Sequence, residues 1–512
     1  TGTLIVLIGG IFWFLLPLLS IGSAVDIPDY EKRIAVLYLE NRGSEEDSYF
    51  SDGLTEEIIT RLSRIDKISV VSRFDVAEYR GTNIHLDEIH DKLEADFLLT
   101  GNVMKLNDKI KVSVELVDLE KRDVEWSESF EKDMSDIFSI QDEVAINIVA
   151  NLDITIGSQD KELILADPTT NTDTYDAILR MKKRSYNKTV ALENIEEINN
   201  ILKDDPAYAE ALGLRSAFHI YYFQSAFLHL KPYTAENRKY VEQAISDAER
   251  ALTYDPLNLI ALSALPTAYI WSAIKSLNTS SKIMAARKSL VAINNLKNAY
   301  PDHYMTTLII GNYHIMKELH PLTMSSSDYE NAKKLLTETI ISAEKGIKNG
   351  ISDPWLLFAY QGALELMIIT EYKYSFYSNS IYYTDILIDL LKNEYNIETL
   401  VKIYYWSCLP KIMVGDYEGV INDIMASRNL ADQLPQTFDI EQSRFNSSLL
   451  LGYTYVQLGK IELGLDILNQ VDTNTTFFEN YWRAKPEYYG YMALAYFESG
   501  DQKSGIDYFY KN

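Results

Sequence analysis

The chain begins with an uncharged, strongly apolar segment. Residues 1–25 carry no charged side chain, and a helix of about 20 apolar residues spans the ~30 Å hydrocarbon layer of a bilayer. The pattern predicts a transmembrane anchor over residues 1–25. The alternative is a signal peptide cleaved near Gly22-Ser23-Ala24, but the apolar run exceeds a signal core and no basic segment precedes it. The expected anchoring side chains are Leu4, Ile5, Leu7, Phe12, Trp13, Phe14, Leu18 and Leu19.

Short apolar runs and amphipathic helices alternate between residues 30 and 157. The run from Arg33 to Leu39 is typical of a buried strand. The next helix has Asp52 as its expected N-cap, and Leu54 and Ile58 share one of its faces. Further strands are predicted at 68–72, 97–99 and 109–116, and further helices at 86–93 and 137–152. This alternation of strands and helices predicts a small α/β domain over residues 30–157.

Residues 170–512 show helical periodicity and almost no strand alternation. Breaks between the predicted helices fall at Asp205-Pro206, Asp255-Pro256 and Tyr300-Pro301. Proline in such a place follows one helix and precedes the next. The pattern therefore predicts an all-α region of successive helical hairpins.

Net charge restricts the class of partner. The chain has 74 acidic and 48 basic residues, a net charge of -26. Such a charge repels the phosphates of nucleic acids, so we expect no nucleic-acid binding. No basic segment precedes residues 1–25, so charge does not set a membrane orientation either.

Residues that could perform catalysis or bind a metal do not occur at the spacings of known motifs. His85 and His90 are five positions apart on a predicted helix, where they point in different directions. The phosphate-binding and HExxH motifs are absent from the sequence. Cys408 is the single cysteine, and we expect it to pack rather than to act as a nucleophile. The sequence predicts a protein that is not an enzyme and has no cofactor or metal.

Several blocks in the α/β region resemble a known domain. They are Phe50-Ser51-Asp52-Gly53-Leu54-Thr55-Glu56-Glu57, Leu99-Thr100-Gly101-Asn102-Val103, Glu115-Leu116-Val117-Asp118 and Asp136-Ile137-Phe138-Ser139-Ile140-Gln141-Asp142-Glu143. In this order they resemble the TolB amino-terminal-like domain of membrane-bound class III adenylate cyclases and transmembrane winged-helix regulators. The resemblance implies a domain between a membrane helix and TPR repeats, across the membrane from a cytoplasmic cyclase or DNA-binding domain. An output domain of that kind is absent from the predicted domains.

The C-terminal part resembles degenerate TPR repeats. The repeat-packing positions are Gly452, Tyr455, Gly459, Ala493, Tyr496 and Gly500. Small residues at such positions allow two helices to approach closely. Stacked helical pairs bury a continuous core and leave a concave surface suited to another polypeptide. We therefore expect partner proteins to bind the repeats.

Paired tyrosines are the candidate protein-binding residues. They are Tyr221 and Tyr222, Tyr404 and Tyr405, and Tyr488 and Tyr489. Tyrosine is favoured at interfaces because it buries a large ring and keeps a polar tip. The alternative is that these rings belong to the core of the repeats.

Together these features predict a multidomain protein with one N-terminal transmembrane helix (1–25), a small α/β TolB amino-terminal-like domain (30–157) and an all-α TPR-like solenoid (170–512). The expected function is a membrane-anchored scaffold or accessory subunit that recruits partner proteins. The alternative is the extracytoplasmic sensor region of a cyclase-like or winged-helix signalling protein whose output domain lies outside this chain. The expected localisation is a single-pass membrane protein with most of the chain outside the cytoplasm, and the bilayer as a further partner.

Overall fold

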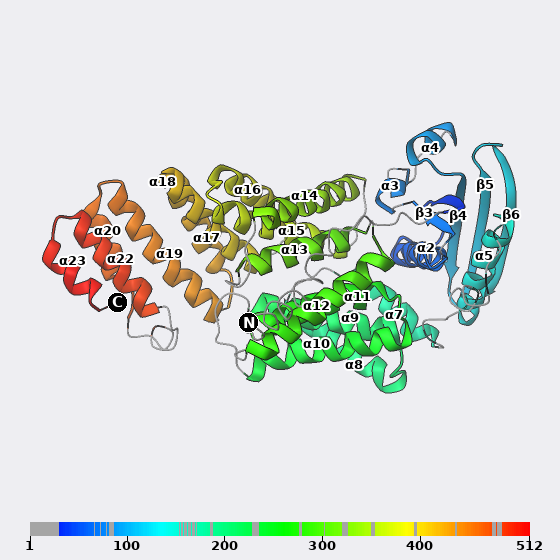
Figure 1. Cartoon of the computed structure of the whole chain (residues 1–512), viewed down its shortest axis with the longest axis horizontal. Helices are drawn as coiled ribbons and strands as arrows, with labels where there is room; N and C mark the ends of the chain where they lie inside the picture. Colours follow the sequence, from blue (N-terminus) through cyan, green and yellow to red (C-terminus); the bar gives the residue numbers. More distant parts are fainter. Residues whose placement is uncertain are drawn as a thin grey trace, which may run out of the picture.

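The computed structural model describes residues 30–511 with short gaps. The residues left out within this range are 66, 72, 78, 81–85, 153, 155–156, 158–160, 162–164, 166–168, 170, 185–187, 228–234, 276–278, 302, 320–325, 350–353, 394–396, 436–437, 474–477 and 479–483. The molecule is elongated, with a β-sheet at one end and the C-terminal helices at the other (Figure 1).

The N-terminal part is a compact α/β unit, called the sheet domain below. Its strands are β1 (Lys32–Val36), β2 (Glu40–Asn41), β3 (Ile68–Val70), β4 (Phe97–Leu106), β5 (Lys109–Asp118) and β6 (Asp123–Asp133). Its helices are α2 (Ser48–Ser63), α3 (Arg73–Ala77), α4 (Leu86–Leu93) and α5 (Ile137–Asn151), with short 3₁₀ turns η2 (Glu45–Asp47) and η3 (Met134–Asp136).

The sheet has the strand order β3-β1-β4-β5-β6. β1 is parallel to β3 and β4, whereas β4, β5 and β6 form an antiparallel meander. Alternate strand residues face opposite layers: Ile34 packs with the core of α2 and α5, and Ala35 with the core of α3 and α4. Helices therefore cover both faces of the parallel part of the sheet.

The expected N-cap of the first helix is wrong. Helix α2 begins at Ser48, and Asp47 is its N-cap residue. Asp52 therefore lies inside the helix, where its carboxylate is engaged by Arg80 and Lys183. Ion pairing across elements, rather than local capping, explains this aspartate.

The rest of the described chain is helical and is called the solenoid below. Its helices are α7 (Thr172–Lys182), α8 (Lys188–Asp204), α9 (Ala209–Phe227), α10 (Ala235–Tyr254), α11 (Leu259–Lys275), α12 (Thr279–Ala299), α13 (Tyr304–Leu319), α14 (Ser326–Lys348), α15 (Pro354–Lys373), α16 (Tyr377–Asn393), α17 (Ile397–Val414), α18 (Tyr417–Ala431), α19 (Phe438–Gln457), α20 (Ile461–Asn469), α22 (Ala484–Glu498) and α23 (Gln502–Phe509).

Neighbouring helices of the solenoid form hairpins that stack on one another. α9 packs on α10, α11 on α12, α13 on α14 and α17 on α18, and α9, α11, α13 and α15 also touch in succession. None of the described side chains of α9, α11 and α13 is exposed. These three helices therefore lie in the interior of the solenoid. This stacking is the TPR-like repeat organisation that the sequence predicted.

Hydrogen bonds connect the proline-containing turns that separate neighbouring hairpins. Arg250 Nη2 donates to the Pro206 carbonyl at 2.9 Å, and the Tyr300 hydroxyl donates to the Leu257 carbonyl at 2.6 Å. Asn258 Nδ2 reaches the Glu210 carboxylate at 2.7 Å. These bonds align the turns along one edge of the solenoid.

The predicted fold class and localisation need a correction. Within the described residues, no helix combines the length and the apolar character that crossing a bilayer requires. This finding contradicts the transmembrane helix in the predicted fold class and the single-pass membrane placement. The expected anchor residues, Leu4, Ile5, Leu7, Phe12, Trp13, Phe14, Leu18 and Leu19, lie outside the described residues.

Candidate functional site at the junction of the sheet domain and the solenoid

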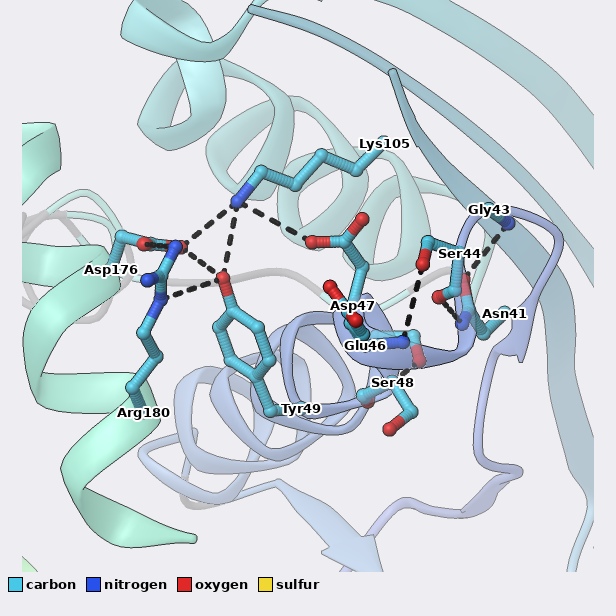
Figure 2. Close-up of polar contacts among 11 residues, drawn as sticks. Asn41, Gly43, Ser44, Glu46, Asp47, Ser48, Tyr49, Lys105, Asp176 and Arg180 are labelled. Atoms are coloured by element: carbon cyan, nitrogen blue, oxygen red, sulfur yellow. Dashed lines mark hydrogen bonds and ion pairs between the residues drawn. The ribbon is translucent and has the colours of Figure 1, made fainter. Parts of the chain in front are cut away.

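A polar turn between β2 and α2 positions the start of α2 where the sheet domain meets the solenoid. Asn41 Oδ1 accepts from the Gly43 amide at 2.9 Å, and Asn41 Nδ2 donates to the Ser44 carbonyl at 2.6 Å. Ser44 Oγ caps the following 3₁₀ turn by accepting from the Glu46 amide at 3.3 Å. The local hydrogen bonds of Asn and Ser fix this turn and place Tyr49 in the first turn of α2 (Figure 2).

Tyr49 is the centre of a cluster that joins α2, β4 and α7. Its hydroxyl donates to Asp176 Oδ1 at 2.7 Å and accepts from Lys105 Nζ and Arg180 Nε, each at 3.1 Å. Lys105 Nζ also donates to Asp176 Oδ1 at 3.0 Å, and Arg180 Nη2 lies 2.8 Å from Asp176 Oδ2. Figure 2 shows these side chains converging from the two domains. We call Tyr49, Lys105, Asp176 and Arg180 the junction cluster.

The charge states of the junction cluster are set by burial and by its own hydrogen bonds. Burial and the bond to Asp176 raise the pKa of the Tyr49 hydroxyl above its usual value. Burial alone would lower the pKa of Lys105, but its bonds to Tyr49 and Asp176 outweigh that effect and raise the pKa. The tyrosine is therefore neutral and the lysine charged at neutral pH, so cations and carboxylates remain paired.

A second set of contacts lies farther along α2. Asp52 accepts from Lys183 Nζ at 2.9 Å and also pairs with Arg80. The backbone of α2 comes so close to α7 that a Cβ on Gly53 would lie 2.7 Å from Leu179 Cδ2. A larger residue at this position would push the Leu179 side chain aside, so glycine favours the close packing of α2 on α7.

The sheet domain also reaches later repeats. Arg64 Nη2 lies 2.9 Å from Asp255 Oδ2 in the α10–α11 turn. Asp75 of α3 pairs with Lys345 near the end of α14, and α3 packs on α14. The sheet domain is thus held at separate points along the turn edge of the solenoid, which fixes its orientation.

The contacts at the junction hold the sheet domain against the solenoid, and they do not form a recognisable catalytic arrangement. Its polar groups are mutually paired, and the described residues contain no group of three or more metal-ligating side chains. His90 Nδ1 lies 2.9 Å from the Ala95 carbonyl, and His85 lies outside the described residues. Cys408 is buried, and burial raises its pKa far above the usual value.

The predicted tyrosines lie in packing positions. The Tyr221 ring is 5.6 Å from Phe358 of α15, and the Tyr222 ring is 4.7 Å from Tyr240. Tyr404 and Tyr405 are half-buried beside separate core clusters. Tyr488 is buried, with the Tyr489 ring 5.5 Å away. The structure does not bring the six tyrosines together, and their role in partner binding stays a prediction.

The predicted repeat-packing residues lie in the α19–α23 hairpins. A Cβ on Gly452 would lie 2.5 Å from Leu468 Cγ, and Gly459 and Gly500 end helices with φ of 75° and 84°. Ala493 is buried, Tyr455 is half-buried, and the Tyr496 ring stacks on Tyr508 at 5.4 Å. Close helix approach and left-handed helix ends account for the glycines.

Comparison with known proteins finds partial likenesses. The model of the HilA/YgeH-like transcriptional regulator second domain matches residues 31–147. A putative adenylate cyclase 3 from Rhizobium meliloti (strain 1021) is 28% identical over 181 residues, which cover 35% of this chain and 31% of that protein. The chain thus spans less than a third of the length of that relative.

Two solved structures align with parts of the chain. TolB from Acinetobacter baumannii aligns with a TM-score of 0.20 and 18% identity, covering 25% of this chain and 29% of TolB. A tetratricopeptide repeat protein from Parabacteroides merdae ATCC 43184 aligns with a TM-score of 0.30 and 13% identity, covering 65% of this chain and 99% of that one.

Sequence reasoning missed the junction cluster. Its hydrogen bonds join residues that are far apart in the sequence: Tyr49, Lys105 and Asp176 are at least 56 positions from one another. No periodicity links residues so far apart, so only tertiary structure reveals them.

Proposed function

We propose that this protein is a protein-binding scaffold whose solenoid holds a partner polypeptide and whose sheet domain is fixed to the solenoid's turn edge. The observation that carries this proposal is the stacking of α9 on α11, α11 on α13 and α13 on α15. Such stacking gives a continuous inner surface, and helical solenoids of this kind use that surface to bind other proteins. The proposal assigns binding, rather than catalysis, to the chain.

Affinity isolation of the full chain from its native cells, followed by hydrogen exchange of the purified complex, tests the proposal. We expect a near-stoichiometric partner whose binding slows exchange in solenoid helices. A partner that protects only β5 and β6 would move the binding function to the sheet domain. Isolation of the chain without any partner would refute the scaffold.

A second candidate function is the regulatory region of a signalling protein. The matches to a transcriptional regulator domain and to a putative adenylate cyclase favour it. The junction cluster would then carry a binding event on the solenoid to the sheet domain. Slower exchange in α2 on partner binding, lost in Asp176→Asn, would support this function; unchanged exchange in α2 would contradict it.

A further inference from the structure

Helix α15 presents one continuous half-buried stripe. Phe358, Gln361, Gly362, Glu365, Leu366 and Ile369 are partly accessible, whereas the other positions between 358 and 369 are buried. Spacings of three and four put these residues on one helix face. The Phe358 ring contacts Tyr221 of α9 at 5.6 Å, so the stripe faces the inner side of the solenoid.

Gly362 has no packing reason to be glycine. A Cβ at this position would meet only Leu308 Cδ1 at 3.9 Å, an ordinary van der Waals contact. By contrast, a Cβ on Gly311 of α13 would lie 3.0 Å from Leu336 Cδ2. Glycine inside a helix is unfavourable relative to alanine, and close approach of another backbone is a common reason to keep it.

Glu365 lies one turn beyond Gly362 on the same stripe. Gln361 Nε2 donates to its carboxylate at 2.8 Å. Glu365 forms no ion pair among the described residues, and the charge of Lys402 lowers its pKa by less than burial raises it. Burial raises the pKa of Glu365 above its usual value. Burying an ionised carboxylate costs free energy unless a cation pairs with it.

We propose that the α15 stripe binds an extended segment of a partner protein whose backbone crosses Gly362 and whose lysine or arginine side chain pairs with Glu365. The proposal rests on the scaffold function and specifies the partner's chemistry. Phe358 and Ile369 supply apolar contacts on either side of the charge. One bound segment would thus explain both the glycine at position 362 and the lack of an ion-pair partner for Glu365.

Selection of random 12-residue peptides against the full-length chain, followed by affinity measurement with synthetic copies, tests the proposal. We expect selected peptides to share a basic residue. Their affinity should fall at least tenfold in Glu365→Gln, because a charge-assisted hydrogen bond is lost, and in Gly362→Leu, which fills the stripe. Glu441→Gln on α19, also a glutamate but exposed, is the matched control and should bind normally. Circular dichroism and thermal melting verify that each variant folds.

The outcomes separate this inference from the scaffold function. Peptides that bind tightly but tolerate both Glu365→Gln and Gly362→Leu would overturn the α15 stripe while leaving the scaffold in place. Selected peptides without a basic residue would also overturn it. A chain that selects no peptide at all, yet binds a native partner on other helices, would refute the stripe and retain the scaffold.

Discussion

Replacing single glycines with alanine should have opposite effects at two places in the solenoid. At Gly452 the new methyl group would lie 2.5 Å from Leu468 Cγ and 3.0 Å from the Gly464 carbonyl oxygen. Leu468 is fully buried and cannot move aside freely. Overpacking of this kind costs about 1–3 kcal/mol, against a helix-propensity gain of about 0.5–1 kcal/mol. We expect Gly452→Ala to destabilise its repeat by roughly 0.5–2 kcal/mol.

Gly362→Ala is the matched comparison. Its methyl group would meet only Leu308 at 3.9 Å, so the gain of about 0.5–1 kcal/mol should appear without a steric cost. Solenoid stability is approximately a sum over repeats, so the assay is native-state hydrogen exchange. Amides of α19 and α20 should exchange faster in Gly452→Ala, and those of α15 more slowly in Gly362→Ala. Equal stability in both variants, or a less stable Gly362→Ala, would refute the packing argument.

Other predictions concern the junction and the buried titrating groups. Lys105→Met removes the two hydrogen bonds that Lys105 Nζ donates to Tyr49 and Asp176. This loss should cost about 1–3 kcal/mol, measured as faster exchange in α7, whereas Lys109→Met at an exposed position should change little. Burial lowers the pKa of His219 to about 4, so the unfolded chain protonates first, near pH 6.5. Stability should therefore fall by about 3 kcal/mol between pH 6.5 and 4, and His219→Phe should remove that part of the pH slope measured by urea unfolding. Cys408 is fully buried and its pKa is raised; iodoacetamide should label it only after denaturation, and rapid labelling of the native chain would contradict this.

Local patterns determined much of the architecture. The strands and helices of the sheet domain follow from short-range alternation and helical spacing, and the Asp-Pro turns mark boundaries between hairpins. These features depend on residues close in sequence, so a single chain suffices to predict them. The prediction of Asp52 as an N-cap was wrong because its side chain forms a long-range ion pair with Lys183, which local sequence does not reveal.

Only the tertiary structure decided how the two parts meet. The bond between Tyr49 and Asp176 spans 127 positions, and the pair of Asp75 with Lys345 spans 270. The same holds for Gly362, whose unfilled side is visible only once α13 and α9 are placed beside α15. Sequence periodicity tells which face of a helix is apolar, but the superhelix decides whether that face meets another helix or stays open to a partner.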